Sequence, residues 1–139
     1  MAKGNGGTRT NSDTKSMQLA IINASNPMRD DYHVGIRSIS DIKTFSEALE
    51  YSLEENGGDS ISVYPDVTDG MLRDAQRSGK IVVYSSKPIE DGAFVSPSRM
   101  MAQDYAGSNT VFSKEVNVSD VAWINADEGQ FAKIKIKRK

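Results

Sequence analysis

The segment from Gly79 to Gly107 constrains the fold more than any other part of this sequence. Residues 81–84, Ile-Val-Val-Tyr, are rich in β-branched side chains and predict a strand. A glycine turn follows, and then a second short strand is expected at 93–95. The sequence Ser-Pro-Ser at 96–98 predicts a helix over 97–106, because Ser96 is a favoured N-cap and proline is tolerated at the first helical position. Few folds use the order strand, turn, strand, helix.

The period of the hydrophobic residues changes from about 3.6 to about 2 at Gly79, which predicts helices before this residue and strands after it. Two helices are expected before it, over 40–54 with Ser40 as N-cap and over 68–78 with Thr68 as N-cap. Further strands are expected at 110–118, 121–124 and 131–136. The predicted fold class is therefore α+β, with about three helices and five or six strands concentrated after residue 80.

The N-terminal part of the chain carries weaker signals. Residues 1–16 are Gly, Asn, Thr, Ser and Lys without apolar periodicity, so we expect a disordered and dispensable tail. Residues 17–24 predict either a strand or one helical turn, and residues 61–64 either a strand or an extended link. Because 139 residues suffice for one hydrophobic core but not for two ordinary domains, residues 17–139 are expected to form a single domain.

Composition excludes several kinds of site. The chain has no cysteine, which excludes disulfides, zinc-thiolate sites and cysteine nucleophiles, and its single histidine, His33, excludes metal sites with two histidines. No metal is therefore expected. A net charge of −2 makes a general role in nucleic-acid binding unlikely, since such proteins normally carry a basic excess. Neither a signal peptide nor a membrane span is evident, so no membrane contact and a cytoplasmic location are expected.

Three motifs resemble the core of the ADP-ribosyltransferase-like domains carried by polyproteins of phages and other mobile elements. They are Val-Tyr-Ser-Ser at 83–86, Ser-Pro-Ser at 96–98 and Trp-Ile-Asn-Ala-Asp-Glu-Gly-Gln-Phe at 123–131. The resemblance covers residues 26–136 and implies a split β-sheet, with NAD as the cofactor. It also implies that an arginine or histidine comes from the first core strand, a Ser/Thr-x-Ser pair from the second, and a glutamate from a late strand or the turn before it.

The resemblance assigns a role to several residues of this chain. Glu128 is the expected catalytic carboxylate, which stabilises an oxocarbenium-like centre, an electrostatic task. Ser85 stands where the family has arginine, and a serine offers neither charge nor a fork to a phosphate. His33 and Arg37, in Tyr-His-Val-Gly-Ile-Arg, are the catalytic candidates for the missing cation. The expected cofactor-binding residues are Tyr84, Ser85, Ser86, Ser96, Ser98 and Tyr105.

Each of these residues also has a simpler structural interpretation. Ser85 and Ser86 would end a strand, Ser96 would cap a helix, and Glu128 would be a solvated turn residue. Three functions therefore stay open. The first is NAD-dependent modification of a host target, and the second is a catalytically inactive module that binds and inhibits a host defence complex, in the manner of an anti-CRISPR protein; both imply a host protein partner. The third is a metal-independent ribonuclease with His33 as the base.

Overall fold

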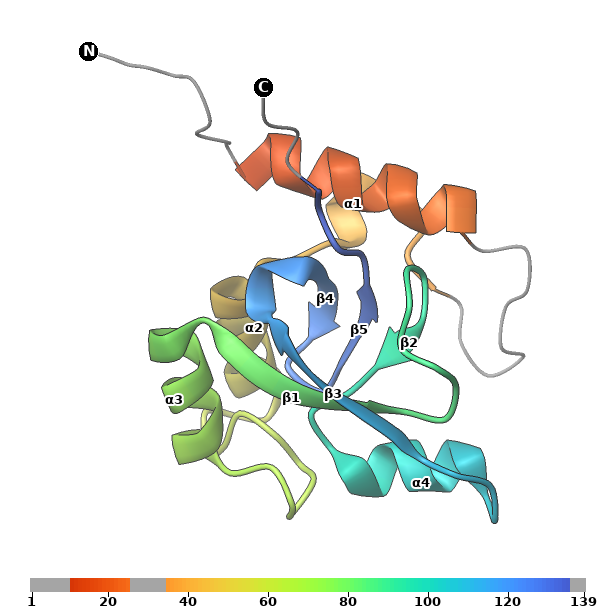
Figure 1. Ribbon diagram of the computed structural model, residues 1–139. Coiled ribbons are helices and arrows are strands. Elements are labelled where there is room, and N and C mark those ends of the chain that lie inside the picture. Colours follow the sequence, from red (N-terminus) through yellow and green to blue (C-terminus); the bar gives the residue numbers. More distant parts are fainter. Residues whose placement is uncertain (1–10, 26–34, 136–139) are drawn as a thin grey trace.

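The computed structural model describes residues 11–25 and 35–135. The described chain begins with helices, and its strands are concentrated in its second half (Figure 1). In chain order the elements are α1 (Asn11–Ser25), the 3-10 helix η1 (Ile39–Asp41), α2 (Phe45–Glu55), α3 (Asp69–Ser78), β1 (Lys80–Ser85), β2 (Phe94–Val95), α4 (Arg99–Ala106), β3 (Phe112–Asn117), the 3-10 helix η2 (Val118–Asp120), β4 (Val121–Asn125) and β5 (Glu128–Phe131).

The strands form two small antiparallel sheets. One sheet pairs β1 with β3, and the other has the order β2, β5, β4. A single isolated bridge joins them, in which the Tyr84 amide donates to the Ser96 carbonyl at 2.7 Å and the Ser96 amide donates back at 2.9 Å. The α+β class expected from the sequence is therefore confirmed, with the sheet divided into two parts that meet between Tyr84 and Ser96.

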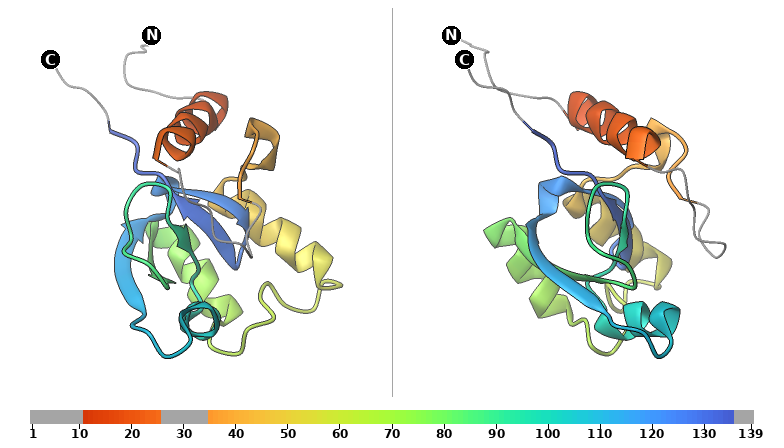
Figure 2. Two further views of the ribbon diagram at one scale, coloured as in Figure 1. Left: turned by 90° about the vertical axis from the view of Figure 1, so that its right-hand side faces the viewer. Right: turned by 45° about the vertical axis from the view of Figure 1, so that its right-hand side comes forward.

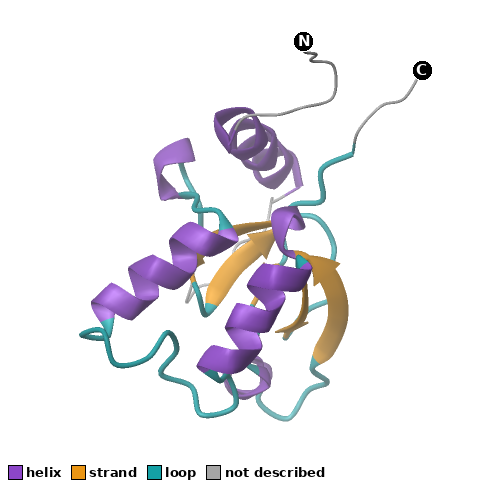
Figure 3. Ribbon diagram, turned by 90° about the vertical axis from the view of Figure 1, so that its left-hand side faces the viewer, coloured by secondary structure: helices purple, strands orange, loops and turns teal. Residues whose placement is uncertain are grey.

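The helices enclose the sheets from several sides. Helix α1 lies at one end of the molecule and α4 at the opposite end, as two views agree (Figures 1 and 2). Helices α2 and α3 lie side by side against the strands (Figure 3). The main hydrophobic core fills the space between them and the sheets, and it includes Phe45, Leu49, Leu72, Val83 and Trp123. A second buried cluster lies beneath α1 and includes Ile22, Ile36, Ile42, Ala122 and Ala132.

Local signals explain where α2 and α3 begin and end. Thr44 caps α2 in a capping box, accepting a hydrogen bond from the Glu47 amide while the Glu47 carboxylate accepts one from the Thr44 amide. Thr68 caps α3, and Gly79 ends it in the left-handed conformation (φ 78°), which glycine adopts without steric cost. The predicted helix over 68–78 is confirmed, whereas the predicted helix over 40–54 begins only at Phe45.

Two expectations about the ends of the chain were wrong, and for residues 17–24 the helical alternative is the correct one. Residues 11–16, expected in a tail, belong to α1, and residues 17–24 continue this helix rather than forming a strand; residues 1–10 lie outside the described residues. Helix α1 docks through contacts that are distant in sequence: the buried Gln18 amide donates to the Ser119 carbonyl, and Lys15 pairs with Glu47. The last strand spans 128–131 rather than 131–136, so Glu128 lies within it.

Two expectations about smaller features were also tested. Residues 61–64 form an irregular link with bends and not a strand. Helix α4 begins at Arg99 with Ser98 as its N-cap, so the prediction that Ser96 caps this helix with Pro97 in its first position was wrong. Within the described ranges, none of the helices is long and apolar enough to span a lipid bilayer.

Candidate functional site

The position of Glu128 depends on an unusually close contact between β4 and β5. A Cβ atom placed on Gly129 would lie 2.7 Å from the carbonyl oxygen of Ala122 and 2.7 Å from a methyl carbon of Val121. Only glycine fits at this point of the pairing. The turn before β5 is closed by the side chain of Asn125, which accepts a hydrogen bond from the Asp127 amide at 2.8 Å. Glu128 is the first residue of β5 and is half-buried.

The sheet register brings Glu128 towards two of the predicted cofactor-binding residues. In the β2–β5 pair, Phe94 lies opposite Gln130 and Val95 opposite Gly129. Continuing this register by one residue sets Ser96 opposite Glu128, and Ser96 is in turn paired with Tyr84. Because opposed residues in antiparallel strands project to the same face, Tyr84, Ser96 and Glu128 form one row across three strands. We call these three residues the cross-sheet row.

Tyr64 lies near the Glu128 end of the cross-sheet row. The pKa of Tyr64 is raised, first by burial of its phenol and then by the charges of Asp127, Tyr105, Asp104 and Glu128. The Tyr64 ring therefore lies within electrostatic reach of both Glu128 and the predicted site residue Tyr105. Tyr64 comes from the link before α3 and packs against the main core, whereas Tyr105 comes from α4 and is exposed. Glu128 thus has one aromatic side chain, from the link before α3, within electrostatic reach.

Asp127, which precedes Glu128, is the second carboxylate of this region. Burial raises the pKa of Asp127, the hydrogen bond from Ser62 lowers it, and the charge of Asp66 raises it further. The Ser62 hydroxyl donates to Asp127 Oδ1 at 2.6 Å and accepts a hydrogen bond from the Tyr64 amide at 3.1 Å. A carboxylate beside the cross-sheet row is therefore linked to Tyr64.

The predicted cofactor-binding serines differ in how their hydroxyl groups are used. Ser98 is fully buried, and its hydroxyl donates to Asp66 Oδ1 at 2.8 Å while it accepts from the Met101 amide. Ser85 is buried, and its hydroxyl oxygen accepts from the Lys87 amide. Ser96 is buried and accepts one bond from the Ser98 amide at 2.9 Å, which leaves its own hydroxyl hydrogen for another acceptor. Ser86 is half-buried.

The segment that carries Arg37 runs beside the same strand as Glu128. The Ile36 amide donates to the side-chain oxygen of Gln130 at 2.8 Å, and Gln130 is fully buried on β5. Gln130 and Glu128 are two residues apart on one strand, so their side chains share a face. Arg37 itself is exposed, and its amide donates to Asp41. His33 lies outside the described residues, so its predicted place beside Glu128 stays a prediction.

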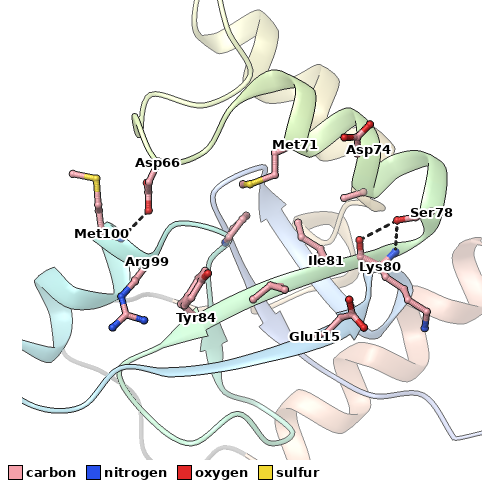
Figure 4. A pocket seen from close by; sticks show the side chains of 13 residues that line it. Asp66, Met71, Asp74, Ser78, Lys80, Ile81, Tyr84, Arg99, Met100 and Glu115 are labelled. Carbon is pink, nitrogen blue, oxygen red and sulfur yellow. Dashed lines mark hydrogen bonds between the residues drawn. The ribbon is translucent and has the colours of Figure 1, made fainter.

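Arg99 supplies a cation beside Tyr84 that was not predicted from the sequence. The guanidinium carbon of Arg99 lies 5.9 Å from the centre of the Tyr84 ring, within the range of a cation–π interaction. Both side chains line a pocket of about 520 Å³ between α3, β1 and the start of α4. Figure 4 shows Tyr84 and Arg99 near one end of this pocket and Lys80 near the other. Arg99 directly follows the Ser-Pro-Ser motif, and that adjacency was the signal available in the sequence.

Across residues 11–25 and 35–135, the structure contains no cluster of three or more His, Asp or Glu side chains able to hold a metal ion. A scan against models of known protein families finds none that matches the chain. Searches of curated proteins and of solved structures also return no significant match. The function of the site is therefore argued from its geometry and chemistry.

Proposed function

We propose that this chain is an ADP-ribosyltransferase-like domain that binds NAD along the cross-sheet row and modifies a host protein. The observation that carries the proposal is the register of β5, which, continued by one residue, sets the half-buried Glu128 opposite Ser96, with Tyr64 in electrostatic reach. A carboxylate, a hydroxyl with a hydrogen to donate, and aromatic rings are the groups needed to hold a ribose and a planar base. These groups come from β5, from the residue that follows β2 and from the link before α3.

Glu128 is the residue to which we assign the electrostatic task. NAD supplies a glycosidic bond to nicotinamide, and positive charge develops on the ribose as that bond breaks. A fixed carboxylate stabilises such charge better in a partly buried site than in water, because the effective dielectric constant is lower there. Ser96 would orient a ribose hydroxyl through its remaining hydrogen, and Tyr64 and Tyr105 would exclude water from the reacting end.

Arg99 is our candidate for the cation that Ser85 does not supply. Its planar guanidinium can donate two parallel hydrogen bonds to a phosphate, and it already lies over Tyr84 at the far end of the cross-sheet row from Glu128. Ser85 is buried, which weighs against supplying the missing cation by an arginine at this position. An arginine there would place a charge in the protein interior and destabilise the fold.

The test compares two isosteric variants of the full chain, Glu128→Gln and Glu54→Gln. Glu54 is an exposed acid on α2 and serves as the matched control. NAD binding is measured by calorimetry, and the release of nicotinamide, with water or a host lysate as acceptor, by chromatography. We expect Glu128→Gln to bind NAD within about threefold of the natural protein and to lose nicotinamide release, because the lost interaction belongs to the transition state. Glu54→Gln should match the natural protein in both assays.

Two results would overturn this proposal. In the first, the natural protein neither binds NAD nor releases nicotinamide. In the second, Glu128→Gln retains full release, which would remove the role of the one carboxylate in the cross-sheet row. Circular dichroism and a thermal melt of each variant exclude misfolding as the cause of a lost activity.

A second candidate function is favoured by the burial of the predicted serines. Ser85 and Ser98 are closed off from solvent, and Ser98 uses its hydroxyl to cap α4 and to bind Asp66. A domain that has converted cofactor contacts into structural ones would be a catalytically inactive module that binds and inhibits a host defence complex. Absence of NAD binding together with a retained effect on host defence would favour this candidate. The third candidate, a metal-independent ribonuclease, depends on His33 and stays a prediction.

A further inference from the structure

We propose that Asp127 is a positioning residue for the Glu128 site, which it serves by holding the Tyr64 loop in place through the hydroxyl of Ser62. The Tyr64 loop is residues 60–68, the link that precedes α3. The inference rests on the proposed function, since it concerns the same site. It assigns a role to the carboxylate next to Glu128 that neither the motif nor the transfer chemistry requires.

The first argument is a continuous chain of hydrogen bonds. Asp127 Oδ1 accepts from the Ser62 hydroxyl at 2.6 Å, a short distance typical of a bond between a hydroxyl and a charged carboxylate. The same Ser62 oxygen accepts from the Tyr64 amide at 3.1 Å. Ser62 is itself buried, so water does not readily replace either bond. The backbone at Tyr64 is thus tied to the turn that presents Glu128.

The second argument is that packing holds this stretch of the loop only in part, through the contact of the Tyr64 side chain with the main core. Val63, between Ser62 and Tyr64, is 68% exposed and contributes little to the core. Other carboxylates fix the loop only near its ends: Asp69 accepts from the Ile61 amide at 3.0 Å, and Asp66 accepts from the Ser98 hydroxyl and the Met100 amide. Between those anchors, the bond to Asp127 is the side-chain tie that fixes Tyr64.

The third argument comes from the charges that face Asp127. Asp66 lies near it from the Tyr64 loop, and the charge of Asp66 raises the pKa of Asp127 and so disfavours its charged form. The Ser62 hydroxyl is the donor that opposes this repulsion. Removing Ser62 therefore leaves a half-buried carboxylate without its donor, and removing Asp127 leaves a buried hydroxyl without its acceptor. The two residues are expected to behave as one unit.

The test is a double-mutant cycle built from Ser62→Ala, Asp127→Ala and the double variant. NAD affinity is measured by calorimetry, and KM and kcat are obtained from nicotinamide release. Each single variant should weaken NAD binding about tenfold and raise KM to match, with kcat within about twofold, because Tyr64 forms a wall of the site and does not react. The double variant should bind no more weakly than the worse single variant. Asp127→Asn, which keeps an acceptor for Ser62, should restore most of the affinity.

The matched control is Ser60→Ala. Ser60 lies in the same loop, but its hydroxyl donates to the Ser62 carbonyl and not to Asp127. Its NAD affinity should stay within about twofold of the natural protein. Additive effects of Ser62→Ala and Asp127→Ala, or an effect of Ser60→Ala as large as theirs, would overturn the proposal, because either result would mean that Asp127 does not act through Ser62.

A readout that needs no NAD separates this inference from the proposed function. Hydrogen exchange of the Tyr64 amide, followed by nuclear magnetic resonance, reports directly on the bond to Ser62. Exchange should accelerate in Ser62→Ala and in Asp127→Ala and should stay slow in Asp127→Asn and Ser60→Ala. If the four variants show these exchange rates but the natural protein does not bind NAD, the Tyr64 loop is positioned as proposed and only the proposed function fails. Unchanged exchange in Asp127→Ala would overturn the positioning role.

Discussion

Replacing Gly129 with alanine tests the strand pairing on which the candidate site depends. The added Cβ would lie 2.7 Å from the Ala122 carbonyl oxygen, 2.7 Å from Val121 Cγ1 and 3.2 Å from Trp123 Cα. Methyl groups do not approach a carbonyl oxygen that closely. Two of the three obstructing atoms belong to the backbone of β4, so no side-chain rotation can relieve the contact. The variant must separate β4 from β5 at this point.

The loss in the free energy of unfolding follows from the contacts between β4 and β5 that such a separation disrupts. Overpacking a close-packed interior typically destabilises by about 1–3 kcal/mol. Loosening the local strand pairing adds about 0.5–1.5 kcal/mol for each hydrogen bond weakened. We expect Gly129→Ala to lower the free energy of unfolding by about 2–4 kcal/mol, which is a large part of the stability of a small domain. The midpoint of thermal unfolding should fall by roughly 10 °C.

Gly70→Ala is the matched control for this change. Gly70 lies in α3, its backbone is not left-handed, and a Cβ there would meet nothing within 4 Å. Alanine should stabilise that helix by about 0.5–1 kcal/mol, because it loses less conformational entropy on folding. Urea and thermal unfolding, followed by circular dichroism, give the change in the free energy of unfolding for both variants. If Gly129→Ala unfolds at the midpoint of the natural protein, the tight β4–β5 contact on which the placement of Glu128 depends is wrong.

Further predictions concern the cap of α4, the cation beside Tyr84 and the response to pH. Ser98→Ala should cost about 1–3 kcal/mol in urea unfolding, because it removes the N-cap and leaves Asp66 without its buried donor; equal stability would contradict the burial of Ser98. Arg99→Gln should weaken NAD binding about tenfold in calorimetry with little change in the thermal midpoint, whereas unchanged affinity would exclude Arg99 from the phosphate site. Burial raises the pKa of Asp127 above its ordinary value of 3.8, so the folded state holds this proton more tightly than the unfolded chain does. Protonated Asp127 therefore contributes to the free energy of unfolding fully below about pH 4, and this contribution is lost as the pH rises through the raised pKa. The urea midpoint of the natural protein, relative to that of Asp127→Asn, should fall as the pH rises from about 4 through the raised pKa.

The parts of the fold that the sequence predicted correctly depend on neighbouring residues. Strand β1 follows from its run of β-branched residues, and the bounds of α3 follow from Thr68 and Gly79. The cap of α4 could not be assigned in the same way. Ser96 and Ser98 are chemically equivalent, and the choice between them is made by Asp66, which is 32 residues away and accepts from the Ser98 hydroxyl. A tertiary contact therefore determines which of the two serines caps α4, because local sequence preference does not distinguish them.

Helix α1 was missed for a related reason. Its sequence is largely polar, and the bonds that dock it join Gln18 to Ser119 and Lys15 to Glu47. Packing of Ile22, on the buried face of the helix, against Ile36 and Ile42 completes the contact. None of these partners can be identified from the helical segment alone, because helices in proteins are stabilised chiefly by the surfaces they meet.

The candidate site shows the same division. The motifs identified Glu128, Ser96 and Tyr84, because each lies on or beside a strand whose pairing follows a simple register. Tyr64 and Asp127 escaped notice, since their relation to Glu128 depends on the path of an irregular link. Arg37 was expected as a cation for the site; the structure ties its neighbour Ile36 to β5 and leaves Arg37 itself exposed.

The pairing order of the strands has a consequence for how the protein forms. Strand β1 pairs with β3 across the intervening β2, and β2 pairs with β5 across the intervening β3, so the two sheets interleave along the chain. No cut between residues 80 and 131 yields a fragment with both sheets complete. During synthesis, the sheet that carries Glu128 must wait until the ribosome has released residue 131, because β5 is its central strand. The nascent chain therefore has no assembled site until its fold is nearly finished.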